Sequence, residues 1–194
     1  MKSTKLLIGI TGSITAIHIP VYLYTLLEVF PNIKIIMSRA AENFIRKETV
    51  SLIIEDVYTS MFPFSKEART HIQLAHWADI FIILPATANI IAQAAHGLGE
   101  TLLSTTILGY ENPVIFFPSM NDSMWKNPAM QQNLSLLDKF GHQVISPIQR
   151  LIMEHASKEK KIEGSMPLPN EVLSILEKEV NKRKTTQKKD NCHV

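Results

Sequence analysis

Small polar residues follow four apolar runs of the sequence, each at the point where the run ends. They are Thr11-Gly12-Ser13 after KLLIGI, Ser38-Arg39-Ala40 after IKIIM, Pro85-Ala86-Thr87-Ala88-Asn89 after DIFIIL, and Pro118-Ser119-Met120-Asn121 after PVIFF. Hydroxyl and amide groups donate hydrogen bonds to phosphate, and glycine lets the backbone approach a ligand closely. The competing interpretation is that these residues only cap helices, since Ser, Thr and Asn are the favoured N-caps. Four clusters of this kind favour a nucleotide-like ligand.

The elements that must position these clusters alternate along the chain. We expect strands over residues 5–10, 33–37, 79–84, 113–117 and 142–145, and helices over 14–29, 40–47, 49–54, 88–96, 99–109, 128–140 and 169–183. Pro20 predicts a kink or a late start of the first helix. This alternation predicts an α/β fold, an open parallel sheet with helices on both faces, as in Rossmann-like and flavodoxin-like three-layer sandwiches. Ligands of such sheets lie beyond the carboxyl ends of the strands, so we expect the clusters to share one site.

The pattern around the first two strands narrows the type of ligand. Only one glycine follows the first strand, and no acidic residue ends the second, so the dinucleotide fingerprint is absent from the sequence. A mononucleotide is the better match. We expect no metal site, because His71 and His76 are five residues apart and do not share a helical face.

Length and composition indicate one domain and exclude several classes of function. The chain has 194 residues, of which 45% are hydrophobic and 20% charged, and its net charge of +2 gives no reason to expect nucleic acid as a partner. No apolar run approaches the ~20 residues of a membrane span. The single cysteine, Cys192, forms no disulfide within the chain, which favours a cytoplasmic location. We expect one domain over residues 1–181 and a disordered basic tail over 182–194.

Three motifs in the sequence resemble the homo-oligomeric flavin-containing cysteine decarboxylases. They are a histidine before the third strand, in "HIQLAHWADIFIILPATANIIAQAAHG", a P-A-S-A-N-like loop in the same stretch, and a P-x-M-N loop in "PSMNDSMW". Within that family the chain is most similar to the peptidyl-cysteine decarboxylases of lantibiotic biosynthesis, of the epidermin and mersacidin type. The resemblance covers about residues 5–180 and implies flavin mononucleotide, FMN, as the cofactor.

The resemblance also implies the roles of individual residues. His71 and Asn121 match the catalytic histidine and asparagine. The positions that match flavin contacts are Gly12, Ser13, Ile14, Ser38, Phe44, Pro85, Ala86, Thr87, Ala88, Asn89, Gly97 and Ser119. The positions expected to bind substrate are Met120, Asn121, Gly164 and Met166. Two positions depart from the family pattern, since relatives often carry Asn or Ala at 119 and Asn at 96, where this chain has Ser119 and His96.

The activity implied by the resemblance is the oxidative decarboxylation of a C-terminal cysteine. The substrate would be a lantibiotic-type precursor peptide, and the product an aminoenethiol used for S-aminovinyl-cysteine formation. Oxidation of the side chain to a thioaldehyde provides an electron sink for the loss of CO2, which an ordinary amino-acid carboxylate lacks. We expect residues 148–166 to be a mobile segment that clamps the peptide.

The resemblance further implies a homo-oligomer built from trimers, up to a dodecamer. The site would then be shared, with flavin held by one subunit and His71 supplied by a neighbour. Residues 14–29 and 88–96 carry more apolar side chains than one layer of a small sheet covers, and surplus apolar surface is typical of subunit contacts.

Two alternatives stay open on the sequence alone. A phosphopantothenoylcysteine decarboxylase of coenzyme A synthesis shares the oxidative half of the reaction, but that enzyme then returns the electrons to the product, a step that in the family uses a cysteine after the fifth strand. Residues 147–167 contain no cysteine. A non-catalytic flavin-binding regulatory protein is the other alternative; such relatives carry acidic tails, whereas this chain has a basic tail and keeps Asn121.

Overall fold

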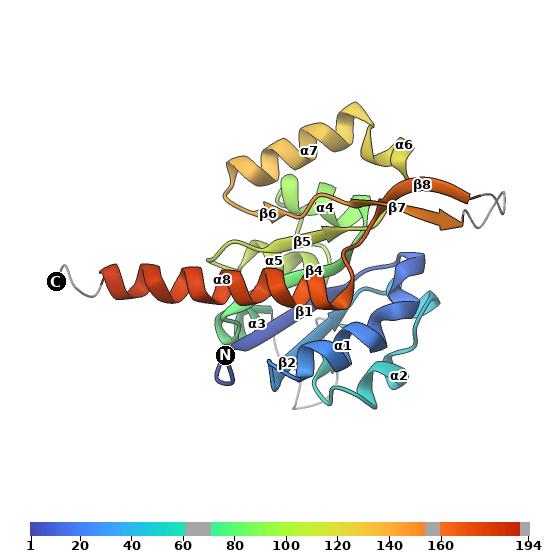
Figure 1. Ribbon diagram of the computed structural model, residues 1–194. Helices are drawn as coiled ribbons and strands as arrows, with labels where there is room; N and C mark the ends of the chain where they lie inside the picture. The colour runs from blue at the N-terminus through green and yellow to red at the C-terminus, as the bar shows by residue number, and fades with distance from the viewer. Residues whose placement is uncertain (61–70, 154–159, 191–194) are drawn as a thin grey trace.

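Six parallel strands form the centre of the structure, a computed structural model that describes residues 1–60, 71–153 and 160–190 (Figure 1). Their order across the sheet is β3-β2-β1-β4-β5-β6. The strands are β1 Lys5–Ile10, β2 Asn32–Met37, β3 Val57–Tyr58, β4 Ile80–Ala86, β5 Ile115–Pro118 and β6 Gln143–Val144, and every neighbouring pair is parallel. The predicted open parallel sheet is confirmed, with β3 as a strand that the sequence did not indicate.

Helices cover both faces of this sheet, which gives three layers. On one face lie α1 Ile19–Leu27 and α8 Pro169–Asp190, and on the other lie α3 His71–Trp77, α4 Ala88–Ala95, α5 Leu102–Leu108 and α7 Pro128–Lys139. Successive side chains of a strand point to opposite faces. Thus Leu6 and Ile8 of β1 pack with α1 and α8, whereas Leu7 packs with the helices of the other face. Burial of both faces explains why the strands read as continuous apolar runs.

The first predicted helix is divided where Pro20 predicted a late start. A 3-10 turn, η1 Ile14–His18, precedes α1, and the proline lies in the first turn of α1, where its missing N–H costs no hydrogen bond. The helix expected over 40–47 is wrong, since only the short η2 Ala41–Asn43 forms there. The helix expected over 49–54 is instead α2 Lys47–Ser51. A further short helix, α6 Asp122–Trp125, was not predicted.

The expectation of surplus apolar surface was right for residues 14–29 and wrong for 88–96. Ile14, Ile17, Val21 and Tyr24 are exposed along η1 and α1. In α4, by contrast, none of the described large hydrophobic side chains is exposed, because α5 and α7 pack against this helix.

Residues 148–166, the segment expected to clamp the peptide, contain the two strands of a hairpin. Strands β7 Ile148–Met153 and β8 Lys160–Ser165 pair antiparallel, with Ile148 opposite Ser165, and the hairpin extends away from the main sheet (Figure 1). Residues 154–159 lie outside the described residues. At the base of the hairpin, the hydroxyl of Tyr22 in α1 donates a 2.7 Å hydrogen bond to the carbonyl of Pro167.

The C-terminal tail was expected to be disordered from Lys182, and this expectation is wrong as far as Asp190. Helix α8 continues through Asp190, and residues 191–194 lie outside the described residues. Lys, Arg and Gln are good helix formers, and Arg183 fixes the helix to the sheet. Its guanidinium donates to Glu179 at 2.7 Å and to the carbonyls of Asp79 at 2.8 Å and Pro113 at 2.9 Å. Over the ranges that the structure describes, no helix is both long and apolar enough to cross a membrane.

Candidate functional site

The loops that follow β1 and β4 meet where the strand order of the sheet reverses. Thr11 joins them, because its hydroxyl donates to the carbonyl of Pro85 at 2.7 Å and accepts from the backbone N–H of Thr87 at 3.0 Å. The side chain of Thr11 is buried. No individual role was assigned to this residue from the sequence, although a polar residue directly after a buried strand is the signal that marks it. The two strand-end loops therefore form one rigid unit.

The loop after β2 packs directly against the loop after β1. A Cβ on Gly12 would lie 2.6 Å from the Cβ of Ala40 and 2.8 Å from its backbone carbonyl, so only glycine fits there. The backbone N–H of Ser38 donates to the carbonyl of Ile10 at 2.9 Å. The close approach expected at Gly12 is thus present within the chain itself, toward Ala40.

The loop after β5 joins the same assembly through Ser119. Its backbone N–H donates to the carbonyl of Ala86 at 2.9 Å. Its hydroxyl lies 2.7 Å from the hydroxyl of Ser13 and 2.8 Å from that of Thr15. All four polar clusters predicted from the sequence are therefore brought together at the carboxyl edge of the sheet.

Three of these polar residues also cap helices, so the capping interpretation holds beside the ligand interpretation. Ser13 accepts from the N–H of Thr15 at 3.5 Å, and Thr87 accepts from the N–H of Ile90 at 3.5 Å. Asn121 accepts from the N–H of Met124 at 2.8 Å through Oδ1. This bond orients the side chain, and its Nδ2 group makes no hydrogen bond to the described residues. An exposed amide donor thus remains at Asn121.

Apolar side chains flank the polar loops at the same edge. Ile14 begins η1 and is 47% exposed, and Phe44 follows η2 and is 40% exposed. Asn89 lies exposed in the first turn of α4, and Met120 is half-buried beside Asn121. Exposed apolar side chains beside hydroxyl and amide donors suit a ligand that has a flat aromatic part and a polar part. The predicted flavin positions around this edge fit such a group.

Two predicted site residues, His71 and Gly97, lie away from this edge within the chain. His71 begins α3, and its Cδ2 lies 3.9 Å from the place of a Cβ on Gly109, which follows α5. Gly97 follows α4 on the side opposite Thr87, and the eight residues of the helix separate the two by about 12 Å. One chain alone does not bring His71 or Gly97 to the strand-end loops.

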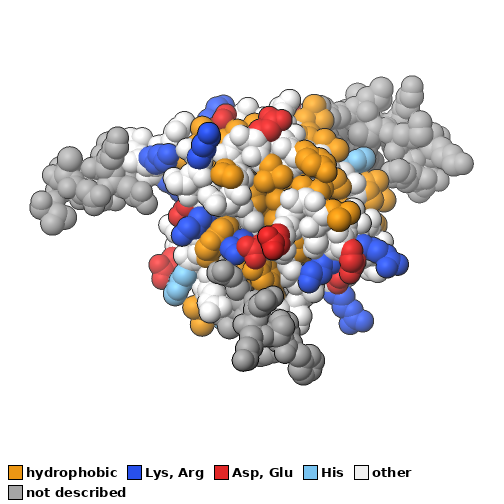
Figure 2. Space-filling view, turned by 90° about the horizontal axis from the view of Figure 1, so that it is seen from below, with side chains coloured by type: hydrophobic (Ala, Val, Ile, Leu, Met, Phe, Trp, Pro, Cys, Tyr) orange, Lys and Arg blue, Asp and Glu red, His pale blue; other side chains and the backbone are white. Residues whose placement is uncertain are grey.

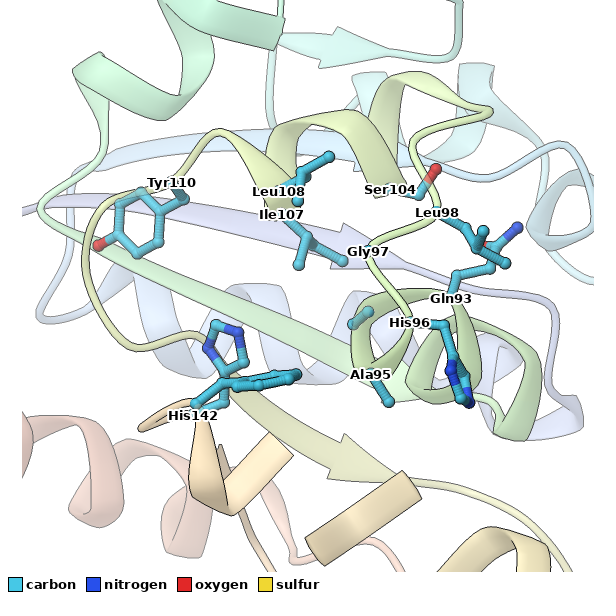
Figure 3. A pocket seen from close by; sticks show the side chains of 12 residues that line it. Gln93, Ala95, His96, Gly97, Leu98, Ser104, Ile107, Leu108, Tyr110 and His142 are labelled. Atoms are coloured by element: carbon cyan, nitrogen blue, oxygen red, sulfur yellow. The ribbon is translucent and has the colours of Figure 1, made fainter. Parts of the chain in front are cut away.

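Gly97 instead lines a cavity of about 420 Å³ between the end of α4, α5 and the end of α7 (Figure 3). A Cβ on Gly97 would meet only Leu108 Cδ1 among the described residues, at 3.8 Å, so steric crowding does not require a glycine here. The positive φ of +64° does, because side chains other than glycine rarely adopt it. His142 lines the same cavity, and its Nδ1 accepts from the backbone N–H of Val114 at 3.1 Å. Burial lowers the pKa of His142 below its ordinary value.

The predicted substrate residues are divided between the site and the hairpin. Met120 and Asn121 lie in the loop after β5, whereas Gly164 lies in β8, opposite Gln149. The side chain of Met166 is buried in the core with α1 and α8. It is therefore not placed to contact a peptide, contrary to the expectation from the sequence. In the part of the chain that the structure describes, no group of three or more His, Cys, Asp or Glu is placed to hold a metal ion.

Comparison with known proteins matches the chain to one family, and the similar proteins include peptidyl-cysteine decarboxylases. The model of the Flavoprotein family matches residues 1–181. The mersacidin decarboxylase of Bacillus sp. (strain HIL-Y85/54728) is 38% identical over 183 residues, which cover 94% of each chain. A solved structure of EpiD complexed with the substrate peptide DSYTC has a TM-score of 0.81 and 32% identity, and the match covers 90% of this chain and 98% of that one. The predicted resemblance is confirmed.

The alternative from coenzyme A synthesis also has a match, which is shorter. The probable phosphopantothenoylcysteine decarboxylase of Streptococcus mutans is 34% identical over 147 residues, 74% of this chain and 82% of that protein. The mersacidin decarboxylase thus matches a larger part of the chain at a higher identity.

Proposed function

The chain belongs to the flavoprotein family, and on this premise we propose that it is an FMN-dependent peptidyl-cysteine decarboxylase. Its substrate is a lantibiotic-type precursor peptide that ends in cysteine, and its product is the peptidyl aminoenethiol that S-aminovinyl-cysteine formation requires. The observation that supports this proposal best is the joined set of polar loops at the β1–β4 switch point, with Asn121 beside it.

The residues at the carboxyl edge fit a flavin mononucleotide. Ser38 and Asn89 offer hydroxyl and amide groups to a phosphate and a ribityl chain, Ser13 lies in the adjoining loop, and Ile14 and Phe44 offer apolar contact to a flat ring. A flavin held there would supply the oxidant that takes a hydride from the cysteine Cβ as the thiol loses its proton, so that the side chain becomes a thioaldehyde and the terminal carboxylate can leave as CO2. A thioaldehyde retains the electrons that the departing carboxylate leaves, so the product is the enethiol.

Asn121 binds the carboxylate of the terminal cysteine in this proposal. Its Oδ1 is occupied by the helix cap, so the Nδ2 group is the part that faces the substrate. An amide N–H donates to a carboxylate, and the cap holds the side chain in one orientation. His71 acts as the base for the thiol or for a coupled proton transfer, since histidine exchanges protons near neutral pH.

A homo-oligomer completes the site, because His71 does not lie at the strand-end loops of its own chain. We propose trimers, assembled up to a dodecamer, in which His71 of one subunit serves the flavin of another. The exposed residues Ile14, Ile17, Val21 and Tyr24 support such an assembly. Figure 2 shows hydrophobic side chains gathered on the face that carries α1. Subunit contacts cover surfaces of this kind.

The hairpin of β7 and β8 is proposed to close over the end of the peptide. Its base is anchored by the bond from Tyr22 to Pro167 beside α1. Closure over the terminal residues excludes water while the thioaldehyde forms. Recognition then depends on the last few residues of the peptide and on its free carboxylate.

The alternative, a phosphopantothenoylcysteine decarboxylase, requires the electrons to return to the product. The stretch from residue 147 to residue 167 contains no cysteine to donate the required proton, so the reaction is proposed to stop at the enethiol. The basic C-terminal stretch and Asn121 also disfavour a purely regulatory flavin-binding protein.

Mass spectrometry of short synthetic peptides that end in cysteine tests the proposal. Incubation with the flavin-loaded protein is expected to remove CO2 together with two hydrogens. Loss of CO2 alone would identify the coenzyme A type of reaction and contradict the proposal. A peptide with an amidated C-terminal cysteine is the matched control, and it is expected to be unchanged because it offers Asn121 no carboxylate.

A further inference from the structure

Ser119 makes a network of hydroxyl contacts that connects two loops far apart in the sequence. The hydroxyls of Ser13, Thr15 and Ser119 lie within 3.2 Å of one another in all three pairs. Ser119 is 106 residues from Ser13 and 104 residues from Thr15. The first two residues follow β1, in the loop proposed to hold flavin. Ser119 directly precedes Met120 and Asn121, in the loop proposed to bind the peptide.

The donor in each of these three contacts can be assigned, because each hydroxyl has only one proton to donate. Thr15 donates to Ser13, which uses the only proton of the Thr15 hydroxyl. The contact between Ser119 and Thr15 must then be donated by Ser119, and the contact between Ser13 and Ser119 by Ser13. The result is a closed ring in which every hydroxyl donates once and accepts at least once. Such a ring resists rotation of any single side chain about χ1, because moving one oxygen breaks both of its bonds in the ring.

The ring and the backbone together fix Ser119 against both cofactor loops. Its backbone N–H binds the carbonyl of Ala86 in the loop after β4, and its hydroxyl binds the loop after β1. Two residues later, Asn121 caps α6. The backbone bond survives substitution by any residue except proline, whereas the link to the β1 loop depends on the hydroxyl of residue 119.

We propose that Ser119 is a positioning residue that sets the place of Asn121 relative to the bound cofactor through the hydroxyl ring. This inference rests on the proposed function and adds to it a residue that acts through Asn121. Because Asn121 is proposed to bind the peptide carboxylate in both the ground state and the transition state, loss of the ring raises KM and changes kcat little.

The test compares Ser119→Ala with Ser119→Thr, which keeps the hydroxyl. Ser119→Ala is expected to raise the KM for a peptide ending in cysteine by about tenfold, with kcat within about twofold, and Ser119→Thr to restore the wild-type KM. Thr25→Ala is the control, since among the described residues its hydroxyl binds only the carbonyl of Val21 within α1. The double variant of Ser119→Ala and Thr15→Val is expected to be no worse than Ser119→Ala alone, because both changes open the same ring.

A second measurement uses the flavin-free protein and no turnover. Amide hydrogen exchange over residues 119–127 is expected to be about tenfold faster in Ser119→Ala and unchanged over residues 128–139. An unchanged exchange rate and KM in Ser119→Ala would overturn the proposal, and so would faster exchange throughout the chain, which indicates a role in stability alone. If the wild type turns over no peptide, the proposed function fails, and the exchange of residues 119–127 still decides the role of Ser119.

Discussion

The two edges of the sheet are joined by different kinds of side chain. At the carboxyl edge, hydroxyls of Thr11, Ser13 and Ser119 join the loops after β1, β4 and β5. At the amino edge the links are charged, since Arg183 binds Glu179 together with backbone carbonyls, and the buried Lys34 pairs with Asp56. Both edges connect segments that are distant in the sequence, and the side chains that do so at the carboxyl edge are neutral hydroxyls.

This difference separates ligand binding from stability. Neutral hydroxyls hold the loops in place without adding a fixed charge of their own beside a bound phosphate or carboxylate. The charged groups at the amino edge hold the last helix and the edge strands. The pKa of the Glu179 carboxyl illustrates this, because burial would raise it and the hydrogen bonds from Arg183 and Gln143 nevertheless keep it below its ordinary value. We therefore expect substitutions at the two edges to affect different measurements.

Asn121→Asp is the substitution expected to have the largest effect on turnover. An aspartate oxygen still accepts from the N–H of Met124, so α6 and the fold persist. The donor at Nδ2 is replaced by a negative charge that repels the substrate carboxylate. We expect kcat/KM to fall about a thousandfold, with flavin content and thermal midpoint unchanged.

Asn127→Asp provides the matched control for this prediction. Asn127 caps α7 in the same way, with Oδ1 accepting from the N–H of Ala129 at 2.9 Å. It lies six residues beyond Asn121, and we expect its substitution to leave kcat/KM unchanged. Equal losses in the two variants would show that helix capping explains the effect, and the role assigned to Asn121 would then be wrong.

Arg183→Ala removes a charged link at the amino edge and is expected to lower the free energy of unfolding without changing activity. The change removes four hydrogen bonds of one guanidinium, including that to the hydroxyl of Tyr110 at 3.2 Å, and leaves the carboxylate of Glu179 buried without this partner. Removing one partner of a buried ion pair costs about 3 kcal/mol of the free energy of unfolding. Urea denaturation measures this cost, and Lys178→Ala on an exposed side of α8 serves as the control.

The activity of Arg183→Ala is expected to equal that of the wild type at temperatures where both remain folded. A loss of kcat/KM in the folded variant would contradict the separation between the two edges. It would place the attachment of α8 among the requirements for catalysis.

The sequence predicted the elements whose signals are local. The long apolar runs of β1, β2, β4 and β5 gave the parallel sheet, and the small polar residues after them gave the candidate site. By contrast, β3 has only two residues, and the hairpin of β7 and β8 is stabilised by pairing between its own strands, for which the sequence has no alternating apolar pattern. The basic stretch from Lys182 looked like a solvated tail because the contacts of Arg183 outside α8 lie 70 to 104 residues away.

The contacts within the candidate site could not be predicted from the sequence alone, because they depend on the order of the strands in the sheet. The hydroxyl ring depends on the loops after β1 and β5 lying on either side of β4, which no local pattern encodes. The same holds for Thr11, whose partners Pro85 and Thr87 are 74 and 76 residues away. His71 and Gly97 were predicted together with the loops through the resemblance, yet they lie elsewhere in the single chain.

Substitutions at Gly97 test whether the assembled protein brings this residue to the flavin. Gly97→Ala and Gly97→Asp share the cost of a positive φ, about 1 kcal/mol, and the Cβ that both add has space. If Gly97 lies near the flavin of a neighbouring subunit, the charge of Asp should remove the flavin absorbance, while Ala should keep it. Equal flavin content in the two variants at equal stability would remove Gly97 from the cofactor site.

The smallest expected effect concerns His142, which contributes a titratable group to the amino side of the molecule. Its Nδ1 accepts from the N–H of Val114, so the ring must be neutral at Nδ1, and burial holds its pKa below the ordinary value. Above pH 6.5 the ring is neutral in both the folded and the unfolded chain, and the stability is complete. As the pH falls below 6.5, the unfolded chain binds a proton that the folded chain does not, so the free energy of unfolding decreases until the pH reaches the lowered pKa.

His142→Asn isolates this contribution, because an asparagine oxygen still accepts from Val114 and does not titrate. Urea denaturation at about pH 7.5 and about pH 5.5 brackets the ordinary histidine pKa of about 6.5. We expect the wild type to lose more stability than His142→Asn between these two values. The control His76→Asn changes an exposed histidine in α3 and is expected to behave like the wild type. The same pH dependence in all three proteins would mean that protonation of His142 is not coupled to folding.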